Sequence, residues 1–340
     1  MLELLPSHLP QKGWPWTEES QIFSTKKADL SEWPRLTIVT PSYNQGRLIE
    51  ETIRSVLLQN YPNLEYIIID GGSNDNTLEI IKKYERWITY WVSEQDKGQS
   101  DAINKGFQKS TGIYGNWINS DDLLEKDALW IISQKIDQIE EKVVFLGDYK
   151  EIEYNGELKR NSRSEIRKLE ELVDIEGHWR NGKSNQIGQQ ATFFPVKLFK
   201  EVGMLNINNH FSMDYELWGR FLIAGAVFHP VHKTLGVFRV YEGQKISDRH
   251  ITTKSLIHTA SKLITGCPDW GAPKKRFYRR LLFRYTAKYY YSHVRSIIGI
   301  RRRIKYFLQR TGIREQGSES RNQGTGIREQ GSGIREQKRG

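Results

Sequence analysis

The feature that most limits the fold is a regular alternation, from Leu36 onward, of short β-branched apolar runs with longer amphipathic segments. The short runs have the length and composition of buried strands, whereas the longer segments repeat apolar residues at helical spacing. Such alternation is typical of a parallel sheet with crossover helices. It predicts an α/β fold, with a mostly parallel sheet and helices on both faces. Strands are expected over residues 36–40, 65–70, 88–93, 115–119 and 143–146, and helices over 48–58, 78–87, 99–110 and 123–140.

Polar clusters follow three of these strands, at residues 70–75, 94–97 and 119–122. Ligands of open α/β sheets bind beyond the carboxyl ends of the strands, so the clusters are candidates for a binding site. In the third cluster, Asp121 and Asp122 are adjacent carboxylates, which suit a hard divalent cation that bridges phosphate oxygens. The alternative is a helix cap, because Ser and Asp favour that position and a helix is expected to follow.

Asp70 and the pair Gly71-Gly72 begin the first cluster. Glycine lets the backbone approach a ligand closely, and a carboxylate there can accept hydrogen bonds from a ribose or a base. The alternative is an ordinary turn. A dinucleotide site is not expected, because no Gly-x-Gly-x-x-Gly fingerprint opens the following helix.

Four motifs stand in order at the expected strand ends. They are Thr40-Pro41-Ser42-Tyr43-Asn44, then Ile69-Asp70-Gly71-Gly72-Ser73 with Asp75 and Thr77, then Asp96-Lys97-Gly98-Gln99-Ser100-Asp101-Ala102, then Asn119-Ser120-Asp121-Asp122. Together they resemble the inverting family-2 glycosyltransferases of GT-A fold. The resemblance is clear over about residues 35–125 and looser to about residue 247.

The resemblance implies a Rossmann-like GT-A sheet, a nucleotide-sugar donor and a Mg²⁺ or Mn²⁺ ion. Two positions depart from the family pattern: Gly71 stands where many members have a second acid, and Tyr241 stands where a metal-ligating His is common. The first departure leaves recognition of uracil open, and the second leaves His229 and His232 as alternative metal ligands. The resemblance assigns the metal to Asp122 and donor binding to Pro41, Tyr43, Asp70, Gly72, Asp96, Lys97 and Asp121.

The segment around Asp214 resembles the family's Glu-Asp motif, whose Asp is the catalytic base. An inverting transfer needs one carboxylate to take the proton of the acceptor hydroxyl. Asp214 is therefore the predicted base, with Glu216 as the second choice and the polar start of an amphipathic helix as the alternative. Residues 189–194 are expected to form a strand on the acceptor side, and Arg239 and Lys245 to screen phosphate charge or to be ordinary surface cations.

The net charge of +10 comes from one segment. Residues 274–310 hold 13 Lys and Arg and no acid, and the rest of the chain has 38 basic and 41 acidic residues. Aromatic and apolar residues repeat at helical spacing within the segment, which favours binding to an anionic membrane surface. Packing on the catalytic domain and nucleic-acid binding are the alternatives, and a nucleic-acid partner is not expected, since the remaining chain is not basic.

Four regions are expected: an N-terminal extension (1–34), a catalytic domain (35–250), a basic helical extension (251–310) and a disordered tail (311–340) in which Gly-Ile-Arg-Glu-Gln recurs. The single cysteine, Cys267, fits a reducing compartment, and the first residues lack the basic and apolar regions of a signal peptide. No transmembrane run is expected.

The predicted function is transfer of a sugar from a nucleotide diphosphate, UDP in particular, to a glycan or lipid-linked hydroxyl with inversion. The predicted place is the cytoplasm, peripherally at the inner face of a membrane. The alternatives are a sugar-phosphate nucleotidyltransferase, which usually has a Gly-rich basic loop after the first strand, and a non-enzymatic basic membrane- or nucleic-acid-binding protein.

Overall fold

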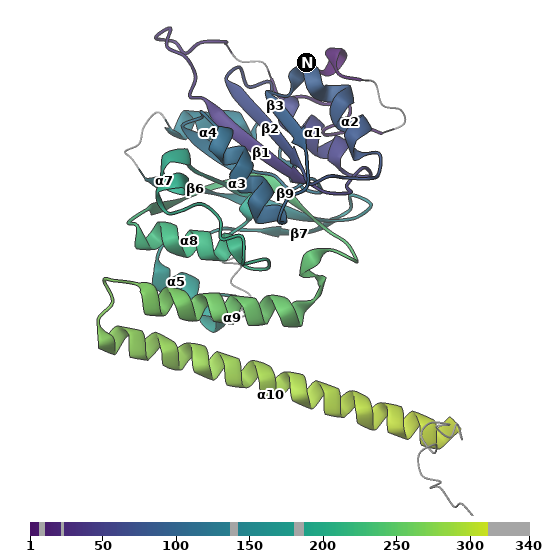
Figure 1. Cartoon of the computed structure of the whole chain (residues 1–340), viewed down its shortest axis with the longest axis vertical. Coiled ribbons are helices and arrows are strands. Elements are labelled where there is room, and N and C mark those ends of the chain that lie inside the picture. The colour runs from purple at the N-terminus through teal and green to yellow at the C-terminus, as the bar shows by residue number, and fades with distance from the viewer. Residues whose placement is uncertain (7–10, 22–23, 137–141, 180–186, 312–340) are drawn as a thin grey trace, which may run out of the picture. The chain divides into compact units, whose positions relative to one another are not determined.

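The computed structural model describes residues 1–6, 11–21, 24–136, 142–179 and 187–311. Within these residues, nine strands form one sheet (Figure 1). The strands are β1 (Leu36–Ser42), β2 (Leu64–Asp70), β3 (Tyr90–Ser93), β4 (Tyr114–Trp117), β5 (Leu123–Leu124), β6 (Val143–Glu153), β7 (Leu158–Ser162), β8 (Thr192–Pro195) and β9 (Val227–Val240).

Helices connect most of these strands, as the periodicity predicts. The α-helices are α1 (Ile49–Leu57), α2 (Thr77–Tyr84), α3 (Gln99–Lys109), α4 (Ala128–Ile136), α5 (Leu169–Val173), α6 (Ile175–Trp179), α7 (Val196–Glu201), α8 (Met213–Ile223), α9 (Arg249–Gly266) and α10 (Ala272–Thr311). Short 3₁₀ helices are η1 (Leu2–Leu4), η2 (Glu85–Trp87), η3 (Gln189–Ala191) and η4 (Lys245–Ser247).

The sheet has the strand order β3-β2-β1-β4-β8-β6-β9-β5, and β7 pairs with β6. The first part is parallel: β1 pairs with β2 and β4, and β2 pairs with β3. The second part is mixed, because β8 runs antiparallel to both β4 and β6, while β6 and β9 are parallel. The loops after β1, β2, β3 and β4 therefore gather at one edge of the sheet, where ligands of such sheets bind.

Helices cover both faces of the parallel strands, which confirms the predicted α/β arrangement. Alternate side chains of a strand point to opposite faces. Leu36, Ile38 and Ile68 accordingly pack in one hydrophobic cluster with α1, α2 and α4. Val39, Ile67 and Ile69 pack in the other cluster with α3, α7 and α8.

The main difference from the predicted elements concerns the segment after the aspartate pair. A helix was expected from residue 123, but Leu123 and Leu124 form β5, which pairs with Val237 and Gly236 of β9. The helix α4 begins only at Ala128. Pairing with a strand more than 100 residues away decides this segment, and the local apolar pattern cannot reveal such a partner.

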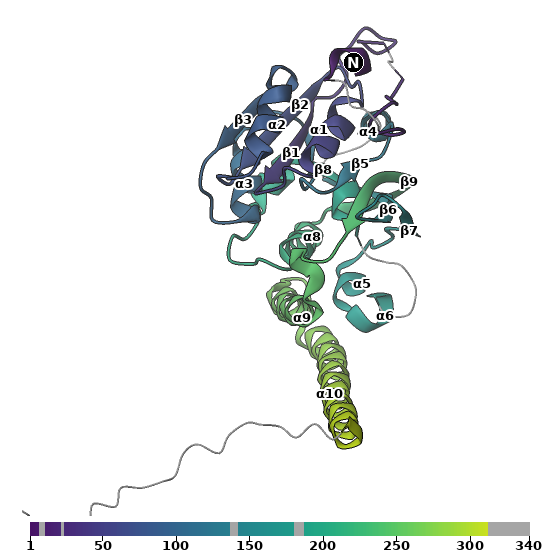
Figure 2. The same ribbon diagram turned by 90° about the vertical axis from the view of Figure 1, so that its right-hand side faces the viewer.

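The chain divides into two compact units, residues 1–287 and 288–340. The first unit includes α9, which lies beside α8 (Figure 2) and buries Ala260, Leu263 and Ile264. It also includes the start of α10. The boundary expected at residue 250 thus does not coincide with a boundary between compact units, because an apolar stripe of α9 completes the core under α8. The expected tail lies outside the described residues, apart from Thr311, which ends α10.

No helix among the described residues is both long and apolar enough to cross a membrane.

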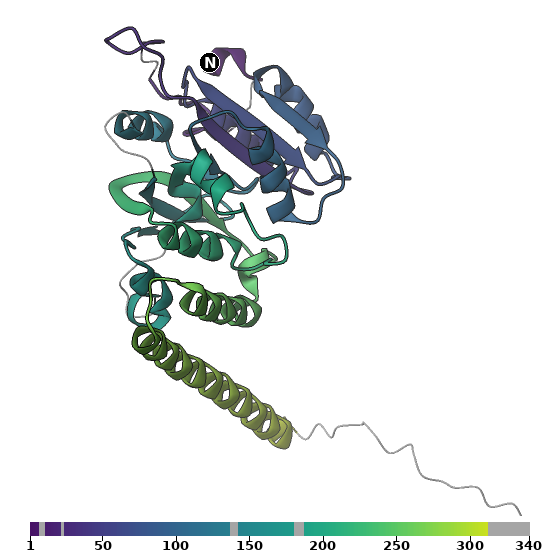
Figure 3. The same cartoon turned by 60° about the vertical axis from the view of Figure 1, so that its left-hand side comes forward.

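One buried cation, Arg54 of α1, binds the N-terminal segment at several points. The Arg54 guanidinium donates hydrogen bonds to the backbone carbonyls of Pro6, Pro15 and Trp16 at 3.0–3.1 Å. Its carbon lies 5.2 Å from the centre of the Trp16 ring. Figures 1 and 3 show this purple segment beside the first part of the sheet. The extension is therefore a folded part of the unit.

Replacing Arg54 with methionine is expected to lower the free energy of unfolding by about 3 kcal/mol or more, because buried carbonyl groups lose their donor. Urea unfolding followed by circular dichroism measures the change. Arg47→Met is the matched control, since Arg47 is exposed just before α1. A change for Arg54→Met no larger than that of the control would show that these hydrogen bonds do not hold the segment.

Candidate active site

A cavity of about 820 Å³ opens at the carboxyl ends of the parallel strands. We name it the donor cavity after the residues that were predicted to bind the donor. Five of the predicted donor-binding residues line it, namely Pro41, Tyr43, Gly72, Asp96 and Asp121. Tyr43 presents its ring to solvent, with 59% of the residue exposed. Residues after β1, β2, β3 and β4 and residues from the end of β9 onward form the rest of the wall, so the fold brings together residues as far apart in the chain as Pro41 and Lys245.

Asp70 lies beneath this cavity and is not part of its wall. Its carboxylate accepts hydrogen bonds from the backbone N–H of Gly72 and Ser73, at 3.1 and 2.9 Å. It also accepts from the hydroxyls of Ser73 and Ser93, at 2.5 and 2.7 Å. With four donors already bound, Asp70 shapes the turn that lines the cavity.

The glycine pair after Asp70 has two separate roles. Gly72 has φ +85°, a conformation that suits glycine, and its backbone lines the cavity. At Gly71, a Cβ atom would lie 2.7 Å from an Asp96 carboxylate oxygen. Asp96 therefore fills the space beside position 71. Lys97, predicted to bind the donor, is exposed and lines neither this cavity nor the one described below.

The aspartate pair is divided between two cavities. Asp121 lines the donor cavity, where one carboxylate oxygen accepts from the Tyr241 hydroxyl at 3.0 Å and the Gln244 amide at 3.2 Å. Asp122 is buried, and its two oxygens accept from the Arg239 backbone N–H and the Asn119 amide, at 3.1 and 3.0 Å. Burial, reinforced by the charge of Asp121, raises the pKa of Asp122 well above the usual value. Since α4 begins at Ala128, neither residue caps a helix.

Arg239 holds this region together and is only 3% exposed. Its guanidinium donates to the backbone carbonyls of Asp121 and Tyr154, at 3.3 and 3.0 Å, and to the Glu51 carboxylate at 2.5 Å. Because these bonds use the hydrogen-bond donors of the Arg239 guanidinium, the role of Arg239 is to position the aspartate pair. Phosphate screening, one of the two expectations for Arg239, does not fit this geometry, and Lys245 is left as the candidate.

A second cavity of about 430 Å³ lies next to the donor cavity, and Asp214 lines it. The two cavities share four lining residues: Gln99, Asn119, Phe238 and Lys245. A hydrogen-bonded row joins three of them, because Lys245 donates to Gln99 at 3.3 Å and Gln99 donates to Asn119 at 2.7 Å. A donor in the first cavity and a hydroxyl in the second would therefore meet at this shared wall.

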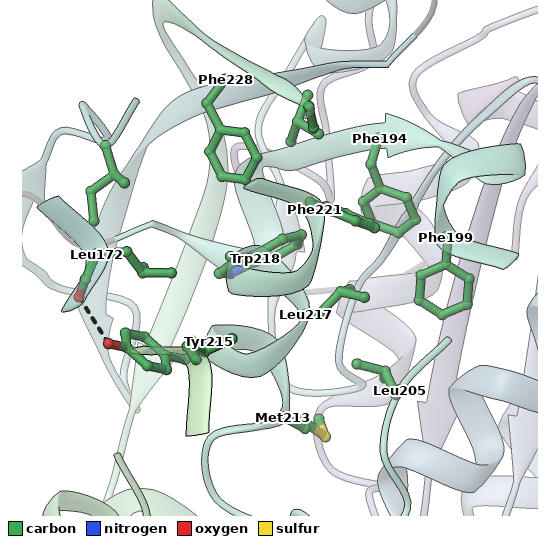
Figure 4. Close-up of a cluster of buried hydrophobic side chains, with 14 of the residues drawn as sticks. Leu172, Phe194, Phe199, Leu205, Met213, Tyr215, Leu217, Trp218, Phe221 and Phe228 are labelled. Carbon is green, nitrogen blue, oxygen red and sulfur yellow. Dashed lines mark hydrogen bonds between the residues drawn. The ribbon is translucent and has the colours of Figure 1, made fainter. Parts of the chain in front are cut away.

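Asp214 is held at the second cavity by its neighbours in the first turn of α8. Met213 and Tyr215 on either side are buried in the aromatic cluster beneath the helix, and Tyr215 donates to the Leu172 carbonyl at 2.8 Å (Figure 4). Burial raises the pKa of the Asp214 carboxyl, while the Tyr215 backbone N–H and the charge of Lys245 act against the rise. A carboxylate with a raised pKa is, in its ionised form, a stronger base than an ordinary aspartate.

Glu216, the second choice as base, has a structural role. Its carboxylate accepts from the side-chain amides of Asn206 and Asn209, and the Asn209 bond is 2.6 Å long. It lines neither cavity. The geometry therefore favours Asp214 over Glu216.

The described residues contain no cluster of three or more His, Cys, Asp or Glu side chains that could hold a metal ion. His229 and His232 lie toward the opposite end of β9 from Arg239 and line neither cavity. Asp121 and Asp122 are left as carboxylate ligands. This set fits Mg²⁺ or Mn²⁺, because such ions are bound through one or two carboxylates and complete their coordination with substrate phosphates and water.

The sequence pattern did not single out three glutamines of the site. Gln99 and Gln244 contact Asn119 and Asp121, and Gln189 donates to the Trp117 carbonyl at 2.5 Å and accepts from Asn119 at 3.3 Å. Gln99 lies within the third motif, and Gln244 lies between Tyr241 and Lys245, which the sequence analysis had considered, so both had a signal nearby. Nothing in the sequence distinguishes Gln189 from its neighbour Gln190.

Comparisons with known proteins identify the family and the fold of the chain. A sequence model of glycosyl transferase family 2 matches residues 37–203. An uncharacterized glycosyltransferase of Rickettsia typhi is 28% identical over 213 residues, which cover 62% of this chain and 65% of the relative. The putative teichuronic acid biosynthesis glycosyltransferase TuaG of Bacillus subtilis is 38% identical over 104 residues, which cover 29% of this chain and 41% of that protein. The chain thus spans less than two thirds of the length of these curated relatives.

Among solved structures, residues 1–349 of S. aureus TarS in complex with UDP-GlcNAc superpose with a TM-score of 0.54 at 17% identity. The match covers 73% of this chain and 70% of that one, and it shows that the fold is the GT-A glycosyltransferase fold. The motif order, the two adjoining cavities and the family match give one conclusion: the chain belongs to glycosyl transferase family 2.

Proposed function

We propose that the protein transfers one sugar from a nucleoside diphosphate donor, UDP-linked, to a hydroxyl of a glycan or lipid-linked acceptor, with inversion at the anomeric carbon. The observation that carries the proposal is the pair of adjoining cavities, with Asp121 in the larger and Asp214 in the smaller. Inversion requires the acceptor to attack from the side opposite the leaving group. Separate cavities on either side of a shared wall suit that geometry.

In the donor cavity, Tyr43 offers an exposed ring on which a base can stack, and the glycine turn lets the nucleotide approach the backbone. Asp96 presents a carboxylate that can accept a base N–H, in the space beside Gly71. It takes the place of the acid that position 71 lacks. This arrangement supports a nucleotide donor. We assign base recognition to Asp96, and to Asp70 the role of holding the glycine turn.

A Mg²⁺ or Mn²⁺ ion bound here would offset the charge that builds on the departing diphosphate. The sequence assigned the ion to Asp122. The carboxylate that faces the donor is Asp121, whereas both oxygens of Asp122 already accept hydrogen bonds. We therefore assign the leading role to Asp121, with Asp122 and Arg239 fixing its position.

On the acceptor side, the Asp214 carboxylate accepts the proton of the attacking hydroxyl as the new glycosidic bond forms. Lys245 lies at the shared wall, where its ammonium group can contact the diphosphate, and its charge partly opposes the rise that burial causes in the pKa of Asp214. An aromatic cluster that includes Trp218 and Phe221 packs beneath α8, the helix that carries Asp214 (Figure 4).

A screen of UDP-, GDP- and TDP-sugars with Mn²⁺ tests the proposal. Release of nucleoside diphosphate is expected from one or more UDP-sugars, slowly by hydrolysis and faster once a suitable acceptor is added. Release of pyrophosphate from a nucleoside triphosphate and a sugar 1-phosphate would instead identify a nucleotidyltransferase, and no turnover of any nucleotide sugar would contradict the proposal.

We also propose that residues 274–310 attach the protein to an anionic membrane surface on the cytoplasmic side. Packing accounts for one side of the segment only, since Leu282 and Tyr285 are buried in the core of the first unit. Phe283, Tyr290 and Val294 are 73%, 39% and 52% exposed, at the spacing of one helix face. Basic residues around an exposed apolar stripe are typical of helices that lie on membranes.

The full chain is expected to sediment with vesicles that contain phosphatidylglycerol, and to be released when salt is raised to about 1 M, where screening is nearly complete. A chain that ends at Ala287, the boundary of the first compact unit, is expected to stay in solution. Equal sedimentation with neutral phosphatidylcholine vesicles, or retention of binding by the shortened chain, would contradict this proposal.

A further inference from the structure

The second cavity, which contains Asp214 and is called the acceptor cavity from here on, has a rim of groups that carry or can carry positive charge. His210, Lys245 and Arg249 all line it, and they come from the loop before α8, from η4 and from the first turn of α9. Segments far apart in the chain thus bring three such groups to one opening. His210 also lies close to the donor cavity, because a Cβ on Gly98 would be 3.9 Å from its ring nitrogen.

The acidic side chains that line the same cavity already have partners. Glu151 is paired with Arg160 at 2.5 Å, and both oxygens of Asp122 accept hydrogen bonds. Asp214 is the proposed base and interacts with Lys245. Within the described part of the chain, no ion pair joins Arg249 or His210 to an acid. The rim therefore carries positive charge that the cavity itself does not balance.

The position of Arg249 strengthens this charge. It is the first residue of α9, an 18-residue helix whose first turn contains no acid. The start of a helix is already partly positive, so a cation there is unfavourable for the stability of the helix. The Asp248 side chain only partly offsets this, since it accepts hydrogen bonds from the backbone N–H of His250 and Ile251. An anion at this rim would face both the guanidinium and the helix start.

The floor of the cavity is aromatic. Trp117 and Trp218 line it and stack on each other, with ring centres 5.7 Å apart, and Tyr149 and Phe211 line it as well. Trp117 and Trp218 are almost fully buried, so the rings that can contact the apolar face of a sugar are those of the partly exposed Phe211 and Phe238. The cavity as a whole therefore matches a ligand that has a ring to place on the floor and a negative charge to place at the rim.

We infer that the acceptor carries an anionic group, a phosphate or a carboxylate, that binds Arg249 and His210 while its hydroxyl faces Asp214. The inference rests on the proposed function, since it specifies the acceptor of that reaction. A diphosphate-linked saccharide and a uronic acid are two sources of the same chemistry. In both, the charge lies within one sugar ring of the reacting hydroxyl.

Ligand-observed NMR titration tests this on the full chain, with UDP and the diamagnetic ion Mg²⁺ present to fill the donor cavity. The probes are methyl glucuronide, N-acetylglucosamine 1-phosphate and methyl glucoside. At least one anionic probe is expected to bind about tenfold more tightly than the neutral glucoside. Tighter binding of the glucuronide would indicate a uronic acid, and tighter binding of the phosphate would indicate a phosphate-linked acceptor.

Arg249→Gln is expected to remove this preference and to leave UDP affinity unchanged. Lys254→Gln is the matched control, because Lys254 is exposed on the same helix and does not line the cavity. Equal affinity for all three probes, including binding too weak to detect for all of them, overturns the inference. So does an Arg249→Gln variant that keeps the preference. Failure of UDP to bind the wild type would contradict the proposed function itself, which is a separate outcome.

Discussion

Replacing Asp214 with asparagine is expected to lower turnover by about 10² to 10⁴-fold, the usual contribution of a general base. A sugar hydroxyl does not ionise near neutral pH, so its proton has to be taken during the attack. Asparagine keeps the size and polarity of the side chain but cannot accept the proton. Affinity for UDP with Mn²⁺ is expected to stay within a factor of about two, because Asp214 lines only the acceptor cavity. Steady-state kinetics and calorimetry on the same preparation measure both quantities.

The dependence of turnover on pH gives a second test of the same residue. Burial raises the pKa of Asp214, and the base works only when ionised. Turnover should therefore fall as pH decreases through a pKa above the usual value of 3.8 for Asp. This acid limb should be absent from the residual activity of Asp214→Asn.

Glu216→Gln is the control for Asp214→Asn, with the melting temperature recorded for both. It should lower stability, since Glu216 accepts from Asn206 and Asn209, and should change turnover per folded molecule far less. A near-normal rate for Asp214→Asn would exclude it as the base. Loss of UDP binding in that variant would place Asp214 in the donor site instead.

Replacing Asp121 with asparagine is the second change with a large expected effect. Affinity for UDP in the presence of Mn²⁺ should fall by at least about tenfold, or roughly 1.4 kcal/mol. Affinity measured in EDTA should hardly change, because the effect passes through the metal. Asp122→Asn should have a smaller effect on binding, since its oxygens already accept from Arg239 and Asn119. Calorimetry of UDP with both variants, with and without Mn²⁺, compares them.

A larger loss for Asp122→Asn than for Asp121→Asn would show that Asp122 is the main ligand, as the sequence motif suggested. Wild-type affinity for UDP that does not depend on Mn²⁺ would contradict the metal proposal altogether.

The parts of this protein that the sequence determines are those set by local pattern. The apolar run from Leu36 and the helical spacing of Ile49, Ile53 and Val56 predict β1 and α1, because a strand or a helix shows its buried face in its own periodicity. The motifs at the strand ends likewise predict the place of the donor cavity, since parallel strands bring their carboxyl ends to one edge.

Tertiary structure decided which of those motif residues face the cavity and which are buried beneath it. Asp70 and Asp96 stand in similar strand-end clusters, yet one is buried under four hydrogen-bond donors and the other faces the cavity. Arg239 is bound to Asp121 and Glu51 across 118 and 188 positions of the chain. Side-chain burial and partners depend on contacts between distant segments, and a local pattern contains no information about them.

The same reason separates Asp121 from Asp122. As neighbours in sequence they are equivalent carboxylates, and either could hold a metal or cap a helix. The pairing of β5 with β9 delays α4 to Ala128 and brings the backbone N–H of Arg239 to the Asp122 carboxylate. Asp121 is thereby left at the wall of the larger cavity, whereas Asp122 is buried and held by Arg239 and Asn119. The sequence determined that two acids stand at this strand end, and the long-range strand pairing decided which of them is open to that cavity.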